Sequence, residues 1–296
     1  MTKPRPRIAA APISWGQCEV PGWGHQIARE RVLEEMVALG IGATEAGPDG
    51  FLPDDPSELR EFLAAYAMSL VGGFTPLVLH GDEARWRAAI DTVSRRFAAA
   101  AGEVVVIAAA TGMDDYDARP ELSADDWTRF LRALDGAAEI AATHGVRTVL
   151  HPHLGTMVET PEDIDRVLEG SSAALCLDTG HVMLGGGDPV ALSQQAPERI
   201  AHLHLKDVDA DLAARVVAGE LTFSQAVPAG VFRPLGDGDV DLAAIIDSVR
   251  AAGYGGWYVM EQDVMLAAEP PAGEGPRTDV ARSLDFLGHR LFGVAP

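Results

Sequence analysis

Short apolar runs alternate with longer stretches of helical period along most of this chain. Runs of strand length occur at Ile8–Ile13, Gly42–Ala46, Ser69–Phe74, Val104–Ala109, Arg147–His151, Ala174–Asp178, Ile200–Lys206 and Gly256–Glu261. Helical periodicity predicts helices at Ile27–Leu39, Ser57–Ala67, Glu83–Ala101, Ser123–His144, Pro161–Leu168, Pro189–Gln195, Leu242–Ala252 and Arg277–Phe292. Ser123, with Asp126 three residues later, is typical of a helix N-cap. Eight strand–helix units predict a (β/α)8 TIM barrel, a fold of about 250 residues.

The remaining segments fit one domain over residues 1–296, because no linker divides the chain. An irregular insertion is expected at 208–235, with a short helix at 210–218, and the last predicted helix would close the barrel. Long connections at 49–56, 112–120 and 264–275 also follow strands, on the side where barrel loops shape a pocket. An open doubly-wound sheet is less favoured, since SWGQCEVPGWG after the first strand lacks the glycine spacing of a phosphate-binding turn.

Charge and cysteine content restrict the class of partner. The chain of 296 residues has 44 acidic and 23 basic side chains and a formal charge of -21, which disfavours a nucleic-acid partner. Its two cysteines, Cys18 and Cys176, form no disulfide framework, and we expect Cys176 to be buried and inert. No signal-peptide core or membrane-spanning stretch is present, so a cytoplasmic protein with a small-molecule partner is expected. The insertion and the C-terminal segment could support a homo-oligomer.

Four side chains with metal-binding chemistry lie at or near the ends of the fifth to eighth strands: His151, Asp178, His204 and Glu261. In a TIM barrel the carboxyl ends of the strands form the catalytic face, so these side chains are expected to converge. Two imidazoles and two carboxylates suit Mn²⁺, Co²⁺, Fe²⁺ or Zn²⁺ better than Ca²⁺ or Mg²⁺. His202 shares a strand face with His204, and periodicity alone does not choose between them.

Three further polar side chains are candidates for catalysis and substrate binding. Lys206 shares the face of His204, where it could bind a substrate oxygen or stabilise an enolate, or else pair with a nearby aspartate. His181 follows Asp178 across Thr-Gly and could act as an acid, a base or a hydroxyl ligand. His153 follows His151 in the same way. Either histidine could instead orient a metal ligand.

Aromatic and acidic residues near the early strands are candidates for substrate contact. Trp15, Trp23 and Phe74 could pack on the CH face of a sugar ring, although such residues are more often core. Glu45 ends the second strand and could accept hydrogen bonds from substrate hydroxyls, with a structural ion pair as the alternative.

Eight sequence runs carry a resemblance to a known family: APISWG, TEAGPDGFLP, LVGGF, HPHLGTMVET, LDTGH, HLHLKD, PLGDGDVD and YVMEQD. They resemble inosose dehydratase (2-keto-myo-inositol dehydratase), within the xylose-isomerase-like TIM barrel superfamily of sugar isomerases and epimerases. The resemblance extends from Ile8 to about Asp263. It implies metal ligands at Asp178, His204 and Glu261, with Mn²⁺ or Co²⁺ preferred and Zn²⁺, Fe²⁺ or Mg²⁺ as alternatives. The first ligand is usually a glutamate, whereas this chain has His151 there.

This departure favours dehydration over epimerisation, because the epimerases use two metal-bound carboxylates as opposed bases. The resemblance implies removal of water from a cyclic keto-polyol through an enolate. Glu261 or His153 would take the proton, Lys206 would stabilise the enolate, and His181 would protonate the leaving hydroxyl. Because water is the only leaving group, no organic cofactor is expected. The alternatives are a metal-dependent sugar isomerase or 3-epimerase, and a non-catalytic polyol-binding barrel. An abasic-site endonuclease is disfavoured by the charge.

Overall fold

A computed structural model describes residues 5–113 and 119–293 of the chain. Parallel strands form one sheet in the order β3-β2-β1-β11-β8-β7-β6-β5-β4, and each strand except at the two ends of this order lies between two others. Its members are β1 (Arg7–Ala10), β2 (Ala43–Thr44), β3 (Ser69–Leu70), β4 (Gly72–Leu77), β5 (Val104–Ala109), β6 (Arg147–Leu150), β7 (Leu175–Asp178), β8 (Ile200–Leu205) and β11 (Trp257–Met260).

The sheet closes through the third strand of the chain, which is broken into β3 and β4 at Val71. The backbone nitrogen of Val71 donates to the carbonyl of Thr44 in β2, and the carbonyl of Val71 accepts from Glu103 and Val104 at the start of β5. The predicted strand Ser69–Phe74 is therefore wrong in its continuity and its end. Gly72 explains the break: its φ is 148°, and a Cβ at this position would lie 1.7 Å from the carbonyl oxygen of Val104. With this strand counted once, the described residues form a (β/α)8 barrel.

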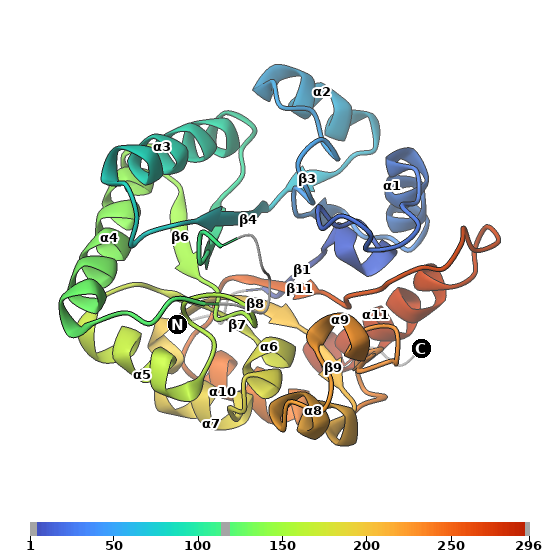
Figure 1. The fold of residues 1–296 in the computed structure, drawn as a ribbon. Coiled ribbons are helices and arrows are strands. Elements are labelled where there is room, and N and C mark those ends of the chain that lie inside the picture. The colour runs from blue at the N-terminus through green and yellow to red at the C-terminus, as the bar shows by residue number, and fades with distance from the viewer. Residues whose placement is uncertain (1–4, 114–118, 294–296) are drawn as a thin grey trace.

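Helices surround the strands in chain order (Figure 1). The ring contains α1 (Arg29–Ala38), α2 (Pro56–Ala65), α3 (Glu83–Ala99), α4 (Ala124–Thr143), α5 (Pro161–Gly170), α7 (Pro189–Gln195), α10 (Leu242–Ala251) and α11 (Pro276–Phe292). Ser123 caps α4 in a reciprocal capping box with Asp126, as its spacing predicts. Of the helices in the described ranges, none combines the length and apolar character needed to cross a bilayer.

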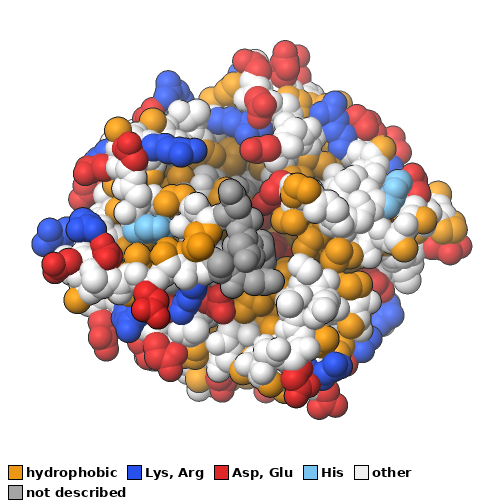
Figure 2. All heavy atoms as spheres, viewed as in Figure 1, with side chains coloured by type: hydrophobic (Ala, Val, Ile, Leu, Met, Phe, Trp, Pro, Cys, Tyr) orange, Lys and Arg blue, Asp and Glu red, His pale blue; other side chains and the backbone are white. Residues whose placement is uncertain are grey.

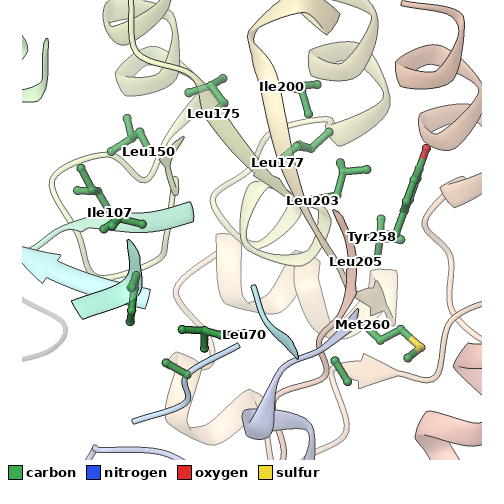
Figure 3. Packing of buried hydrophobic residues seen from close by; sticks show 14 of the residues in the cluster. Leu70, Ile107, Leu150, Leu175, Leu177, Ile200, Leu203, Leu205, Tyr258 and Met260 are labelled. Carbon is green, nitrogen blue, oxygen red and sulfur yellow. The ribbon is translucent and has the colours of Figure 1, made fainter. Parts of the chain in front are cut away.

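Alternate residues along each strand separate into two hydrophobic layers. Leu175 and Leu177 of β7 and Leu203 and Leu205 of β8 pack into the large cluster that also contains helix side chains. Figure 3 shows these leucines with Tyr258 and Met260 of β11 in the same cluster. Cys176, between two of the leucines, instead packs with small valines of β5 and β6. Because strand side chains alternate, His202, His204 and Asp178 share this second, inner layer.

Several connections differ from the predicted ones. The first strand ends at Ala10 rather than Ile13, because Pro12 begins a 3-10 turn, η1 (Pro12–Trp15). A helix that periodicity did not indicate, α6 (Thr179–Leu184), starts directly after β7. The predicted insertion at 208–235 contains the predicted helix as α8 (Ala210–Val217), together with α9 (Phe223–Ala226) and an antiparallel pair of β9 (Asp207–Val208) and β10 (Phe232–Arg233). Residues 114–118 of the predicted connection at 112–120 lie outside the described residues.

Candidate metal and substrate site

Three of the four predicted metal ligands present their donor atoms to one another at the carboxyl ends of adjacent strands. Asp178, His204 and Glu261 form a buried group from β7, β8 and the residue after β11. Nδ1 of His204 lies 3.0 Å from Oε2 of Glu261 and 3.7 Å from Oδ2 of Asp178. These side chains converge because each points to the inside of the barrel and lies at the carboxyl end of its strand.

His151, the fourth predicted ligand, is joined to this group through one carboxylate. Its Nε2 lies 3.1 Å from Oδ2 of Asp178 and both side chains are almost completely buried. The other oxygen of Asp178 accepts from the backbone nitrogens of Gly180 and His181 at 2.9 and 2.8 Å, and so caps α6. Asp178 therefore belongs to the candidate ligand group and also caps the helix that carries His181.

Lys206 directly follows β8, and three carboxylates surround its buried ammonium. Its Nζ is 2.8 Å from Oδ2 of Asp178, hydrogen-bonds Oε1 of Glu261 and lies 3.5 Å from Oδ1 of Asp263. Burial alone would lower the pKa of Lys206, but these carboxylates raise it well above its usual value. For the carboxyl group of Asp263 burial has the opposite effect: it raises the pKa to about 7, although Lys206 opposes the shift.

The centre carries more buried negative than positive charge. Among the described residues, the carboxyl groups of Glu45, Asp178, Glu261 and Asp263 lie here with the ammonium of Lys206, and the most exposed of these side chains, Glu261, is 10% exposed. Burial opposes ionisation, yet His204 and Lys206 together lower the pKa of Glu261 to about 2. The same surplus raises the pKa of His204 well above its usual range, against the effect of burial and through neighbouring Cys176, Glu261 and Glu45. This site therefore stabilises an additional positive charge.

A divalent metal fits this arrangement in both donor type and spacing. Imidazole nitrogen with two carboxylate oxygens is a ligand set suited to first-row divalent ions. Two donors bound to one ion at about 2.1 Å lie about 3.0 to 3.6 Å apart for bond angles of about 90° to 120°. The measured separations at Nδ1 of His204 are 3.0 and 3.7 Å. Within the described residues, Nδ1 of His204 is buried and makes no hydrogen bond, so a metal could take this position by displacing its proton.

Glu45, the residue after β2, accepts hydrogen bonds from two histidines of β8. Its Oε1 lies 2.9 Å from Nε2 of His202 and 3.0 Å from Nε2 of His204. Burial would raise the pKa of Glu45, but His204 and His202 lower it. The positions of the two histidines favour His204 as the ligand, because His204 faces Asp178 and Glu261, whereas His202 lies one step deeper in the barrel.

A stacked pair of histidines borders the ligand group. The rings of His153 and His181 lie 3.6 Å apart at an interplanar angle of 30°, and Phe223 of α9 lies 5.4 Å from the His181 ring. Nδ1 of His153 lies 2.6 Å from the carbonyl oxygen of Leu154 and donates to it, which makes Nε2 the basic nitrogen. Burial lowers the pKa of His153 to about 3, and burial next to His153 lowers the pKa of His181 well below its usual value. Both rings are therefore neutral.

A cavity of about 450 Å³ opens above these groups, within the usual range for small-molecule sites of about 300 to 1,000 Å³. Its wall includes the site side chains Glu45, Phe74, His151, His153, His204, Glu261 and Asp263, with Trp23 and Phe223. Figure 2 shows hydrophobic side chains gathered beside the centre of the face drawn in Figure 1. Apolar surface with a few polar groups is the usual lining of a small-molecule site.

Four residues of the sequence-based set do not line this cavity. Asp178, His181 and Lys206 are buried behind its wall. Trp15 also lies elsewhere. It is fully buried in the main hydrophobic cluster and its Nε1 donates to Glu35 at 2.8 Å, so its position gives a substrate contact no support. The roles predicted for all four residues stay predictions. Asp178, His181 and Lys206 could affect a bound substrate only through the side chains that line the cavity.

Sequence reasoning missed Phe223 and gave no role to Asp263. Phe223 lies within the irregular insertion, where no strand end marks its position, so only the capping pattern Thr222–Gln225 of α9 could have signalled the local helix. Asp263 was visible in the YVMEQD run and, two residues beyond Glu261, could have been expected to point toward the same cavity.

Comparison with known proteins gives matches over nearly the whole chain. The family model described as xylose isomerase-like TIM barrel matches residues 33–287. Rhizopine catabolism protein MocC of Rhizobium meliloti is 34% identical, with 96% of this chain and 90% of the relative covered. The inosose dehydratase of Geobacillus kaustophilus is also 34% identical, with 97% of this chain and 96% of the relative covered.

Solved structures with the same fold have more distant sequences. An L-ribulose 3-epimerase superposes with a TM-score of 0.69 at 18% identity, covering 97% of this chain and 94% of the other. The probable 3-DHS dehydratase of Bacillus anthracis gives 0.68 at 16% identity, covering 96% and 99%. At these identities the likeness concerns the fold alone.

Proposed function

We propose a function that starts from an identification: the chain belongs to the xylose isomerase-like TIM barrel family. It is an enzyme that resembles inosose dehydratases over nearly its full length. Our proposal is a metal-dependent hydro-lyase that removes water from a cyclic keto-polyol, with 2-keto-myo-inositol (scyllo-inosose) as substrate and a trihydroxycyclohexane-1,2-dione as product. The observation that carries the proposal is the convergence of Asp178, His204 and Glu261 under a cavity of small-molecule size.

Asp178, His204 and Glu261 would hold a divalent ion, with Mn²⁺ or Co²⁺ preferred and His151 as a fourth ligand or a partner of Asp178. When bound, the ion supplies Lewis-acid polarisation of the substrate ketone, which acidifies the adjacent C–H. Phe74, Trp23 and Phe223 provide apolar surface along the wall for the CH face of the ring. No organic cofactor is required for loss of water.

Proton transfer is proposed for the groups that reach the cavity. Glu261 or Nε2 of His153 takes the proton next to the ketone, since both line the wall and the neutral His153 is a base. Lys206 is buried behind the wall, so its contribution is to hold Asp178 and Glu261 ionised through direct hydrogen bonds. The leaving hydroxyl receives its proton through Asp263, whose Oδ2 lies 3.7 Å from Nε2 of His181.

His151 supports dehydration over the nearest alternative, a sugar isomerase or 3-epimerase. Two opposed carboxylate bases would suit inversion, whereas here an imidazole stands at the end of β6 and contacts Asp178. Deprotonation from one face with loss of hydroxide at the neighbouring carbon matches this asymmetry.

The test is a direct assay of the purified protein. Metal-loaded protein is incubated with scyllo-inosose, with Mn²⁺ and Co²⁺ tried separately, and the ultraviolet absorbance of the diketone is followed against a chelated control. Product that appears only with metal supports the proposal, and absence of product with both ions overturns it. Solvent deuterium entering the substrate without loss of water would identify an isomerase or epimerase instead. Because the relative named for rhizopine catabolism is equally similar, a rhizopine serves as a second substrate.

A variant separates catalysis from binding alone. His204→Ala removes the imidazole donor and is expected to abolish turnover while the barrel remains folded, as judged by circular dichroism. Equal turnover by this variant would indicate that the measured activity does not depend on the proposed site.

A further inference from the structure

The contact between Glu45 and His204 crosses the interior of the barrel. Glu45 follows β2, His204 belongs to β8, and in the sheet these strands are separated by β1 and β11. Both side chains are nearly fully buried, and one carboxylate oxygen accepts from two imidazoles at 2.9 and 3.0 Å. A buried carboxylate with two such partners is held in one orientation.

The direction of these hydrogen bonds fixes the protonation pattern of the His204 ring. An ionised carboxylate has no proton to donate, so the Nε2–H groups of His204 and His202 are the donors. Because Glu45 holds the proton on Nε2, Nδ1 is the nitrogen that gives up its proton when a cation binds, and its lone pair then becomes the donor. Nδ1 is the atom that lies 3.0 Å from Oε2 of Glu261 and 3.7 Å from Oδ2 of Asp178. It is buried and makes no hydrogen bond within the described residues.

We propose that Glu45 is a positioning residue, which holds His204 in the Nε2–H tautomer with Nδ1 directed at the ion bound by Asp178 and Glu261. A carboxylate that orients a histidine ligand in this way commonly raises its basicity toward the metal. His202 supports the arrangement from the next inner layer, since it binds the same oxygen of Glu45. This inference rests on the metal dependence in the proposed function and gives Glu45 a role other than contact with substrate hydroxyls.

A second ion between Glu45, His202 and His204 is the competing interpretation, because these three side chains also form a group with metal-ligand chemistry. The two hydrogen bonds to Glu45 account for both Nε2 atoms without an ion, which favours positioning. The interpretations differ in stoichiometry: positioning requires one ion per chain, and a second site requires two.

Metal binding without substrate tests the proposal. Co²⁺ is titrated into the metal-free full-length protein in competition with a chelator, and the visible spectrum of the bound Co²⁺ is recorded. We expect Glu45→Ala to raise the Kd for Co²⁺ by about 10- to 100-fold. Glu45→Gln keeps an accepting oxygen but loses the charge, so we expect a smaller rise, about 3- to 10-fold. Each shift should accompany a changed spectrum, because the ring of His204 is released.

Glu35→Gln is the matched control. Glu35 is also a buried carboxylate that accepts from an aromatic side chain, Trp15, but it lies outside the ligand group. A loss of metal affinity through general loosening would appear in Glu35→Gln too, whereas we expect its Kd to change less than about twofold. If Glu45→Ala does not fold, Glu45→Gln alone carries the comparison.

Nuclear magnetic resonance of ¹⁵N-labelled histidine provides the second measurement, on the Zn²⁺-loaded protein. We expect wild-type His204 to show a protonated Nε2 and a metal-bound Nδ1, and Glu45→Ala to lose that pattern. Wild-type affinity in both Glu45 variants would overturn the inference, as would two ions per chain with one lost in Glu45→Ala.

The outcome is distinguishable from failure of the proposed function. A wild-type protein that binds Co²⁺ with the expected dependence on Glu45, but leaves scyllo-inosose unchanged, overturns the dehydratase and leaves the positioning role intact. A wild-type protein that binds no ion overturns the positioning role, and turnover in the presence of chelator then decides the reaction separately.

Discussion

The two ends of the barrel both have a cavity and charged side chains, but they bury those charges very differently. At the amino ends of the strands, a cavity of about 570 Å³ is lined by residues that include Arg7, Glu103 and Trp257. The side chains of Arg7 and Glu103 are 36% and 47% exposed. At the carboxyl ends, Lys206 and Asp178 are both 0% exposed.

This difference separates a surface ion pair from a buried one. Exposed pairs contribute about 0 to 1 kcal/mol, and Arg7 gains in addition from lying 4.4 Å above the Trp257 ring. Burying the charges of Lys206, Asp178 and Glu261 costs more in desolvation than an apolar core would, so stability alone does not explain them. Buried charge, rather than the size of the cavity, is therefore our reason for placing the candidate site at the carboxyl ends of the strands.

The largest expected effect comes from removing the buried cation. Lys206→Met leaves Asp178 and Glu261 buried without their ammonium partner, which should lower the free energy of unfolding of the metal-free protein by about 3 to 5 kcal/mol. Urea unfolding followed by circular dichroism measures the change. A divalent ion should restore part of the loss, since it can replace the missing positive charge. A loss below about 1 kcal/mol would show that the buried and exposed pairs are equivalent.

The second largest expected effect is the stabilisation of the folded protein by a metal ion bound at the carboxyl ends of the strands. An ion that binds only the folded state adds about 2.7 kcal/mol at a concentration of 100 times its Kd. Thermal unfolding with and without Mn²⁺ or Co²⁺ measures this as a rise in Tm. Asp178→Asn should remove the dependence on metal, because the amide is a poor ligand. An equal rise in wild type and variant would place the ion elsewhere.

A smaller effect is expected at the cavity wall. Phe223→Ala removes an aromatic surface next to His181 and should raise KM about 3- to 10-fold, since such contacts contribute about 0.5 to 1.5 kcal/mol, with little change in kcat. Steady-state kinetics measure both constants. Phe292→Ala is the control, because Phe292 is 44% exposed at the end of α11. The proposed role fails if the two variants have the same KM.

The smallest effect is expected at the amino end. A double-mutant cycle of Arg7→Ala and Glu103→Ala should give a coupling energy below about 1 kcal/mol, because water and salt screen the pair. Chemical unfolding of the four proteins supplies the cycle. Coupling as large as that expected for Lys206 would remove the contrast between the two ends.

Much of the fold was predictable because the apolar pattern of each strand is local. A run such as Ala174–Asp178 places a leucine on either side of Cys176, and the inner position at its end is Asp178. The convergence of Asp178, His204 and Glu261 followed from the same rule, since parallel strands bring their carboxyl ends to one face. The family resemblance supplied the reaction, which periodicity does not contain.

Features that depend on distant contacts were not predictable in this way. Trp15 was a candidate for substrate contact with a core position as the alternative, and the structure places it in the core after the turn that starts at Pro12, where Glu35 of α1 accepts its N–H. The helix α6 is too short for a periodic signal and forms because Asp178 caps it. Glu45 meets His202 and His204 only once the sheet has curled, so no spacing along the chain reveals the contact.

The break at Val71 also makes the third strand a natural boundary between two pieces of the molecule. Residues before it carry β1 to β3, those after it carry β4 onward, and Val71 hydrogen-bonds to both sides. A side chain at Gly72 would meet the backbone of Val104 and push the two strands apart. Val71 therefore joins the two halves of the barrel, and a change that displaced its backbone would disturb the pairing on both sides at once, on the side of the sheet that carries Glu45 and on the side that continues to Asp178 and His204.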